Sequence, residues 1–159
     1  MGELAALTGI SRATLHRYSG TRDNLDSQLG QHAKEALLQI LDNIDLLTTQ
    51  PLAAVRQLIQ EHLAQGELIA FLASRYPVHM GVQGETDLQF YLERLDALFF
   101  NGQQQGVFRV DVTATLLTEM FVSLLHGAVD ARQRGRTPRE CSKILESVFL
   151  RGIATQALN

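Results

Sequence analysis

Apolar residues recur at three- and four-residue intervals along most of the chain, and no segment keeps the strict alternation of a half-buried strand. The clearest pattern covers residues 22–47, and Thr21 stands directly before it as a suitable N-cap. The pattern predicts an all-α fold whose long helix joins the N-terminal end to the rest of the chain. The apolar face of this helix consists of Leu25, Leu29, Ala33, Ala36, Leu37, Ile40, Leu41 and Ile44.

Three shorter patterns predict helices in the middle of the chain. The first follows Pro51, which suits the first position of a helix because its missing N–H has no partner there in any case. The second covers residues 68–76, and the third covers residues 86–105 and ends at Gly106. Between these last two patterns, residues 78–85 contain glycines and show no period, so we expect a loop there.

The last third of the sequence predicts a hairpin of two helices. Asp111 is placed to cap a helix over residues 112–134, and Gly135 ends it. Thr137 and Glu140 then form a capping box, with a proline at the first helical position, and open the final helix. The apolar stripes of this hairpin are too wide for a single helix contact.

An apolar hairpin of this kind favours a four-helix bundle formed with a second copy of the chain, because one hairpin alone leaves apolar area exposed. The alternative is that residues 51–105 of the same chain cover the outer face. We expect a homodimer through the two C-terminal helices. The predicted dimer interface consists of Leu117, Leu124, Ala128, Leu145, Val148 and Phe149.

The composition fits a globular protein of one or two domains. With 45% hydrophobic and 19% charged residues, the 159-residue chain can bury a core and is neither fibrous nor disordered. No apolar run approaches the roughly 18 residues of a membrane-spanning helix, and the first residues lack the pattern of a signal peptide, so we expect a cytoplasmic protein without a membrane partner. The single cysteine, Cys141, lies in an apolar stripe and is expected to be a buried thiol.

Charge is unevenly distributed along the chain. The net charge is −3, but residues 1–25 hold three arginines against two acids, a local charge of +1 that leaves −4 for the remainder. All three arginines lie between Ser11 and Arg22, a stretch without any acid. Such a local excess is typical of a protein that touches phosphates with one end only, although a solvated helix face accounts for three arginines equally well.

The most specific motif lies in this positive segment. Thr8 and Gly9 predict a turn, Ser11 is a suitable N-cap for a short basic helix over residues 12–18, and Thr21 caps the helix that follows. This order is typical of the second half of a helix-turn-helix, whose recognition helix enters the major groove of DNA. A complete unit has a further helix packed against it, and only seven residues precede Thr8, so we expect an incomplete head.

The motif resembles the signature of the TetR family of transcriptional regulators. In that family a small residue and a glycine make the turn, a serine starts the recognition helix, and a basic–acidic pair opens the next helix. The remaining chain is similar to the family in layout, with an all-α body and a final hairpin used for dimerisation. The matching residues are Thr8, Gly9, Ile10, Ser11, Thr14, Leu15, Tyr18, Gly20, Arg22, Asp23 and Leu25.

The resemblance implies two domains, a DNA-binding head with its connecting helix over residues 1–47 and a regulatory, ligand-binding and dimerisation domain over residues 48–159. It implies a ligand-responsive repressor that binds a palindromic operator in double-stranded DNA as a homodimer and releases it when a small-molecule effector moves the two heads. Arg12 is placed to read guanine, and several neighbours are placed to hold phosphates. The implied DNA-binding residues are Ser11, Arg12, Thr14, His16, Arg17, Tyr18 and Arg22.

Two positions depart from the family pattern. His16 stands where the family usually has an aromatic residue, and Ser19 stands where it usually has a phenylalanine that packs the recognition helix against the first helix. One interpretation is a chain that begins at a misplaced or trimmed methionine. The other is a descendant of such regulators whose DNA affinity is much reduced, which Ser19 favours because a misplaced start does not alter an internal residue.

The resemblance also implies an effector pocket between the long helices of the second domain. Large or polar-tipped side chains on otherwise apolar faces are candidates for its lining, although packing in the core is the commoner role of such residues. The candidates are His62, Phe71, Tyr76, His79, Met80, Phe90, Tyr91 and Phe121.

The sequence contains no constellation typical of an enzyme, a metal site or a cofactor site. Its five histidines include no pair at i, i+3 or i, i+4, Cys141 has no sequence-adjacent base, and no glycine-rich phosphate loop occurs. We therefore expect neither catalysis nor a bound metal or cofactor. The alternative to a DNA-binding repressor is a dimeric ligand-binding or interaction module that has lost effective DNA binding.

Overall fold

The structure is a computed structural model that describes residues 11, 13–14, 20–44, 49–68, 70 and 86–155. Within these residues the chain forms helices and an isolated antiparallel bridge between Phe108 and Ala154, which confirms the all-α prediction. The predicted loop over residues 78–85 and most of the pattern over residues 68–76 lie outside this description. The elements are α3 (Arg22–Asn43), α4 (Pro51–Ala64), α6 (Thr86–Gln104), α7 (Ala114–Gln133), α8 (Pro138–Leu145), the π-helical turn η1 (Glu146–Leu150) and α9 (Arg151–Ile153).

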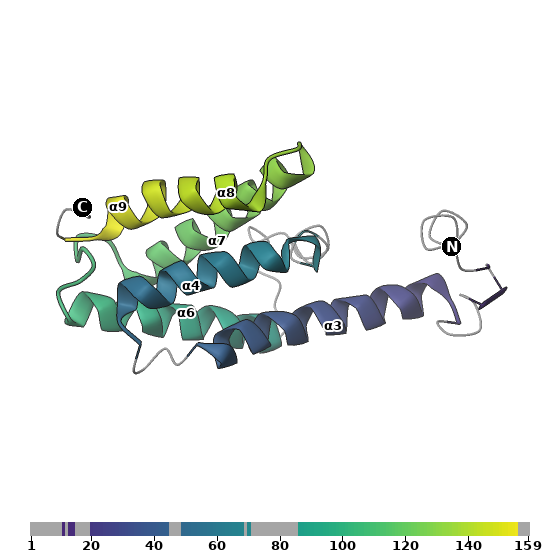
Figure 1. Ribbon diagram of the computed structural model, residues 1–159. Coiled ribbons are helices and arrows are strands. Elements are labelled where there is room, and N and C mark those ends of the chain that lie inside the picture. Colours follow the sequence, from purple (N-terminus) through teal and green to yellow (C-terminus); the bar gives the residue numbers. More distant parts are fainter. Residues whose placement is uncertain are drawn as a thin grey trace.

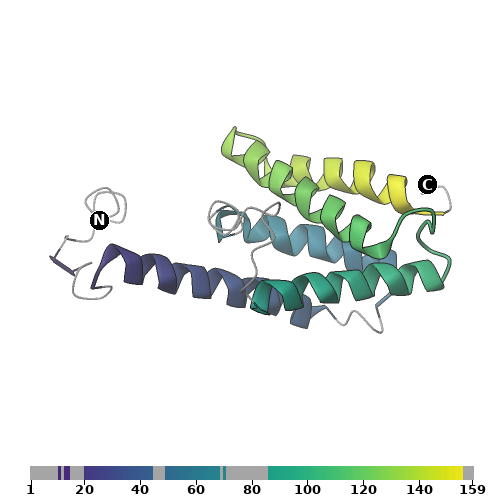
Figure 2. The same cartoon turned by 180° about the vertical axis from the view of Figure 1, so that it is seen from behind.

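The helices pack as a bundle with α3 along one side (Figure 1). The central helix is α4, which contacts α3, α6, α7 and α8. The α8, η1 and α9 segments follow one another as a single rod that runs antiparallel to α7 (Figure 1). The N-terminal half of α3 extends beyond the bundle, at the end where the turn between α7 and α8 lies, and the reverse view in Figure 2 agrees.

Four phenylalanines form the centre of the core. The Phe99 ring contacts those of Phe108, Phe121 and Phe149 at centroid separations of 5.8 to 5.9 Å, and Phe121 lies 5.3 Å from Phe149. Aromatic pairs at such separations contribute about 0.5–1.5 kcal/mol each beyond the area they bury. Gly102 permits this packing because a Cβ there would overlap the Phe108 ring. The core therefore ties α6, the following loop, α7 and η1 together.

Helix α3 begins where the sequence predicts and ends earlier. The Thr21 Oγ1 atom accepts a hydrogen bond from the backbone N–H of Asn24 at 3.2 Å, which confirms the N-cap. The helix ends at Asn43 rather than at residue 47, because Ile44 leaves the helix in an extended conformation with φ −110° and ψ 111°. Ile44 is still only 2% exposed. An apolar residue can enter the core from either conformation, so periodicity alone placed the end too late.

Helix α7, unlike α3, begins at a different residue from the one predicted. The carboxylate of Asp111 is engaged by the guanidinium of Arg109, whose Nε lies 2.6 Å from Oδ1, and so does not cap the helix. Thr113 takes that role, and its Oγ1 accepts the backbone N–H of Leu116 at 3.2 Å. The helix therefore starts at Ala114.

The final helix opens with the predicted capping box. Thr137 Oγ1 accepts the backbone N–H of Glu140 at 3.2 Å, and Glu140 Oε2 accepts the backbone N–H of Thr137 at 2.8 Å. The predicted single helix is interrupted by the π-helical turn η1. A π-turn widens the helix by one residue per turn, which lets the neighbours Phe149 and Leu150 both face the core, at 2% and 1% exposed.

Candidate functional site

The first candidate site is the segment before α3. The Oγ atom of Ser11 accepts the backbone N–H of Thr14 at 3.1 Å, and the two hydroxyl oxygens lie 2.8 Å apart. Residues 13 and 14 are helical, so Ser11 caps a short helix as predicted. Gly20 directly precedes the Thr21 cap and adopts φ +66°, a left-handed conformation that glycine takes without a Cβ penalty.

The other residues predicted to bind DNA are not described in the structure in atomic detail. Arg12, His16, Arg17 and Tyr18 lie outside the described residues, and of Arg22 only its place as the first residue of α3 is described. In the described part of this segment, Ser11 therefore caps one helix start and Thr21 caps the start of α3. Their roles toward DNA remain predictions.

The second candidate site is the His62 cluster, which consists of His62 on α4, Tyr91 on α6 and Phe121 on α7. All three side chains are buried, at 1%, 4% and 0% exposed. The His62 ring lies 5.8 Å from the Tyr91 ring and 6.2 Å from the Phe121 ring, in edge-to-face arrangements. Three of the predicted effector-site residues thus come together from three different helices.

Hydrogen bonds fix the tautomer of His62. Its Nδ1 lies 2.6 Å from the carbonyl oxygen of Leu58, which can only accept, so Nδ1 carries the hydrogen and donates. The Nε2 atom is then an acceptor, and the Tyr91 hydroxyl donates to it in a short hydrogen bond. Both polar side chains are satisfied in the interior, which is the condition for burying them at low cost.

Burial keeps both groups uncharged. It lowers the pKa of His62 to about 4, although the hydrogen bond to Leu58 acts in the opposite direction, and the nearby His126 adds a smaller lowering. Burial also raises the pKa of the Tyr91 hydroxyl. The His62 cluster is therefore a buried, uncharged group of packed rings with one donor–acceptor pair at neutral pH.

The remaining predicted effector-site residues do not join the His62 cluster in the described structure. Phe71, Tyr76, His79 and Met80 lie outside the described residues. Phe90 is 51% exposed, and its ring lies under the guanidinium of Arg94 at 5.8 Å, so it points away from the His62 cluster. Successive helical residues point about 100° apart, and Tyr91 already occupies the inward direction.

The predicted dimer interface needs a similar correction. Leu117, Ala128, Leu145 and Phe149 lie in the core of the single chain, at 1%, 9%, 2% and 2% exposed, and offer little surface to a second copy. Of the other two, Leu124 is half-buried and Val148 is 58% exposed. The periodicity located the two stripes but did not show which edge of each wide stripe faces inward.

Apolar side chains do remain exposed on the hairpin, next to the predicted ones. We define the outer hairpin face as Leu116 and Met120 on α7 with Ile144 and Val148 on α8 and η1, which are 41%, 46%, 58% and 58% exposed. The described residues of segment 51–105 therefore do not cover this face. Three of the four, Leu116, Met120 and Ile144, were not predicted as interface residues, although each stands one or three positions from a residue that was.

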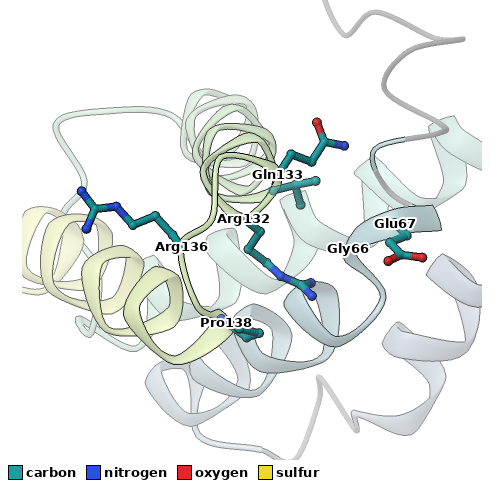
Figure 3. Close-up of a pocket in the computed structure, with 7 residues that line it drawn as sticks. Gly66, Glu67, Arg132, Gln133, Arg136 and Pro138 are labelled. Atoms are coloured by element: carbon teal, nitrogen blue, oxygen red, sulfur yellow. The ribbon is translucent and has the colours of Figure 1, made fainter.

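A hollow of about 190 Å³ lies at the end of the bundle where α4 ends and α7 turns into α8 (Figure 3). The half-buried Arg132 side chain enters it and donates from Nη1 to the carbonyl oxygen of Leu63 in the last turn of α4. A Cβ at Gly66 would overlap Nη1 of Arg132, so a larger residue there would displace this side chain. The guanidinium of Arg136 points away from this contact (Figure 3). Arg132 thus donates a hydrogen bond to a carbonyl group at the end of α4.

Nowhere in the described parts of the chain do three or more His, Cys, Asp or Glu side chains converge as a metal site requires. Every helix among the described residues is too short or too polar to cross a membrane. Cys141 is buried, and its thiol donates to the carbonyl oxygen of Ala128 at 3.4 Å, which confirms the predicted buried thiol.

Comparison with known sequences gives a relative along almost the whole chain. The HTH-type transcriptional regulator NfxB of Pseudomonas aeruginosa is 48% identical over 158 residues, which cover 98% of this chain and 84% of NfxB. The HTH-type transcriptional repressor LfrR of Mycolicibacterium smegmatis is 28% identical over 72 residues, 45% of this chain and 38% of LfrR. No protein-family model matches the sequence.

Solved structures share the fold at low sequence identity. The TetR family transcriptional regulator PfmR of Thermus thermophilus superposes with a TM-score of 0.68 at 20% identity, over 97% of this chain and 87% of PfmR. The TetR-like regulator LfrR of Mycobacterium smegmatis, in complex with proflavine, gives a TM-score of 0.67 at 19% identity, over 98% of this chain and 85% of LfrR. The similarity extends over the bundle and over α3.

Proposed function

The chain belongs to the TetR family of transcriptional regulators, and we propose that it acts as a homodimeric repressor that binds a palindromic operator and releases it in response to an effector. The observation that carries this proposal is the 48% identity to NfxB over 98% of the chain. Two local features support it. Ser11 caps the helical residues 13 and 14, and Thr21 caps α3, in the order expected for the DNA-reading half of a helix-turn-helix.

The proposed operator contacts divide by chemistry. Arg12 lies at the start of the recognition helix, where a guanidinium can reach the O6 and N7 atoms of guanine. The remaining side chains hold phosphates or position the helix, and the start of α3 offers backbone N–H groups for a phosphate. The residues proposed for these roles are Ser11, Thr14, His16, Arg17, Tyr18 and Arg22.

DNA binding is tested by titrating the 159-residue chain against fragments tiled across the region upstream of its own gene. We expect one fragment to bind with an affinity that falls steeply with salt. Each phosphate contact contributes about −0.9 to the slope of log affinity against log salt concentration. Replacing Arg17 and Arg22 with glutamine flattens that slope by up to about twice this value, whereas Arg56→Gln on α4 leaves it unchanged. Binding that ignores both salt and these charges contradicts the proposal.

The alternative function has its own signature in the same experiment. A chain that dimerises and binds an effector, but shows no sequence preference among the fragments, is a dimeric ligand-binding module rather than a repressor. Ser19, where the family usually has a phenylalanine, is the residue that favours this outcome.

The outer hairpin face is the proposed dimer interface. Four exposed apolar side chains lie on two adjacent helices, and a two-fold axis through them generates a four-helix bundle in which each copy covers the other. Gly127 on α7 and Gly152 on α9 are exposed, and a Cβ built at either position meets no atom within 4 Å. Helices of a second copy can therefore approach closely there. Leu124 and Val148 remain from the interface predicted by sequence.

Dimerisation is tested by adding charge to this face. Ile144→Glu combined with Val148→Glu places two carboxylates in a desolvated contact, and we expect sedimentation at micromolar concentration to change from dimer to monomer. The matched control is Gln57→Glu with Gln60→Glu, which adds the same charge at exposed positions of α4. A dimer that survives the first pair but not the control pair places the interface elsewhere.

The His62 cluster is the proposed effector site. It brings together three buried rings and one neutral donor–acceptor pair, so a flat aromatic ligand that separates these rings could stack on them and hydrogen-bond with His62 or Tyr91. LfrR, which shares the fold, was crystallised in complex with proflavine, a planar aromatic dye. We therefore propose planar aromatic compounds as the effector class. The residues outside the description, Phe71, Tyr76, His79 and Met80, remain proposed lining residues.

The effector site is tested with proflavine itself, by its fluorescence change on titration with the protein. We expect saturable binding that weakens roughly fivefold in Tyr91→Phe, since a hydrogen bond contributes about 1 kcal/mol. Phe90→Leu, at the neighbouring exposed position, is the matched control and leaves the affinity unchanged. Equal affinities of the wild type and Tyr91→Phe for proflavine would show that the Tyr91 hydroxyl does not bind the dye.

A further inference from the structure

Arg94 on α6 forms a bridge to the last turn of α3. Its Nη1 donates to Oδ1 of Asp42 at 2.5 Å, and its Nη2 donates to the backbone carbonyl oxygen of Leu41 at 3.2 Å. The two acceptors are a side chain and a main-chain group of neighbouring residues. One planar guanidinium therefore holds the end of α3 at two points, which a single ammonium does not reproduce.

The end of α3 favours such a partner. The partial negative charge at the C-terminal end of a helix favours a cation, and the Leu41 carbonyl, which already accepts the backbone N–H of Ile44 at 3.3 Å, takes Arg94 as a second donor. The last turn of α3 contains no basic residue of its own. Arg94 supplies the missing positive charge from another helix. Its side chain is 27% exposed and that of Asp42 is 60% exposed, so the ion pair lies at the surface and the contact with the Leu41 carbonyl is the part-buried one.

Arg94 is also close in the chain to the His62 cluster. Tyr91, which donates to His62, precedes Arg94 by one helical turn on α6. The Phe90 ring lies under the Arg94 guanidinium at 5.8 Å and limits its movement. A displacement or rotation of this turn of α6 moves the Tyr91 hydroxyl and the Arg94 guanidinium together.

The geometry of α3 amplifies a small change at this point. Its 22 residues span about 33 Å at a rise of about 1.5 Å per residue, and its far end carries the segment before Arg22. A tilt of about 5° at the body end moves the far end by about 3 Å, which is comparable to a hydrogen-bond length. The separation of two such ends determines whether both half-sites of an operator can be reached.

We propose that Arg94 is the residue that couples the His62 cluster to the position of α3. When Tyr91 loses its hydrogen bond to His62, α6 shifts, the Arg94 contacts with Asp42 and Leu41 change, and the end of α3 is released. This coupling role rests on the proposed function for its biological meaning. Its physical content, a link between Tyr91 and the last turn of α3, requires neither DNA nor an effector.

A double-mutant cycle tests the link directly. Amide hydrogen exchange in residues 38–43 is measured for the full chain, Tyr91→Phe, Arg94→Gln and the double variant. We expect Tyr91→Phe to speed exchange there about fivefold, and Arg94→Gln to speed it by at least as much. In the Arg94→Gln background, Tyr91→Phe then has no further effect on this segment. Arg94→Lys, which keeps the charge without the two-pronged contact, gives an intermediate rate.

Two results overturn the proposal. One is that Tyr91→Phe leaves exchange in residues 38–43 unchanged when Arg94 is present. The other is that the two substitutions act independently, so that the double variant shows the product of their separate effects. Arg56→Gln is the control for the loss of an arginine, since Arg56 pairs with Glu146 at 4.0 Å, and it leaves the segment unchanged. If the cycle gives the expected result but the chain binds no operator, the repressor function is contradicted and the coupling is not.

Discussion

The two halves of α3 are held in different ways. Toward its C-terminal end the apolar residues are buried, with Ala33 and Leu41 at 0% exposed and Ile40 at 3%. Toward its N-terminal end Leu25 and Leu29 are only half-buried, and the helix extends beyond the bundle (Figure 1). The same amphipathic pattern therefore anchors one half in the body and leaves the other half as a projecting arm. The arm's position is determined by contacts made at the opposite end.

Gly30 lies at the boundary between these two halves. A Cβ built there meets no atom within 4 Å, so close packing does not explain why this position is a glycine. Glycine in a helix interior costs about 1 kcal/mol relative to alanine. The helix is therefore weakest in intrinsic propensity where it leaves the body, and its two halves are expected to respond differently to similar substitutions.

The largest contrast is expected from truncating one leucine in each half. Leu41→Ala removes a fully buried side chain and should lower the free energy of unfolding by about 2–5 kcal/mol. Leu29→Ala removes a half-buried one and should cost less than about 1 kcal/mol. Urea denaturation followed by circular dichroism, at one protein concentration, measures both. Equal losses would mean that the arm is packed as tightly as the anchor.

A second contrast comes from titrating the interior of the body. The pKa of His62 in the folded chain, about 4, lies below its ordinary value of 6.5, so the unfolded chain binds the proton more tightly. Stability is therefore fully present above pH 6.5 and decreases as the pH falls from 6.5 toward 4, by about 3 kcal/mol in total. His62→Gln should remove most of this pH dependence. The control is His32→Gln, on an exposed position of α3, and a similar effect of both variants contradicts the assignment to His62.

A third contrast uses the same cap at two places. Thr21→Ala and Thr137→Ala each remove an N-cap worth about 1 kcal/mol to its helix. At Thr137 the helix is part of the packed hairpin, so the loss should appear in the global unfolding midpoint. At Thr21 the first turn lies on the arm, so the loss should appear as faster amide exchange in residues 22–26 with little change in the midpoint. Matching midpoint shifts would show that the arm unfolds together with the body.

The smallest effect is expected at the boundary itself. Gly30→Ala should stabilise α3 by about 0.5–1 kcal/mol, because alanine favours the helix and its Cβ meets open space. Gly20→Ala should have the opposite sign, since φ is +66° there and an L-residue pays about 1 kcal/mol in that conformation. Slower amide exchange in the first half of α3 for Gly30→Ala, and faster exchange for Gly20→Ala, is the expected pair of results.

Local signals in the sequence were reliable guides to where helices start. The caps at Ser11, Thr21 and Thr137 were all predicted, because a side-chain hydrogen bond to a backbone N–H three residues later depends on neighbours in the chain. The cap at Asp111 was wrong for a reason of the same kind. A competing local partner, Arg109, holds that carboxylate, and a cap rule applied to one residue at a time does not weigh such competition.

The direction in which each side chain faces was harder to predict than the helix starts. Leu117 and Phe149 were expected at a dimer interface and lie in the core, while the neighbouring Leu116 and Val148 are exposed. Adjacent residues on a helix differ by about 100° in direction, so a stripe that is apolar over most of the circumference does not state which edge is buried. Which edge is buried depends on the helices that pack against α7 and η1.

The sequence by itself determined the helical class, the starts of α3 and α8 and the family resemblance, since these follow from periodicity, caps and a short motif. Only the tertiary structure decided that α3 ends at Asn43, that His62 meets Tyr91, and that Arg94 bridges to Asp42. The last two contacts join residues 29 and 52 positions apart in the chain. Hydrogen bonds between near neighbours are encoded locally, whereas contacts between distant helices depend on how every apolar face in the bundle is satisfied at once.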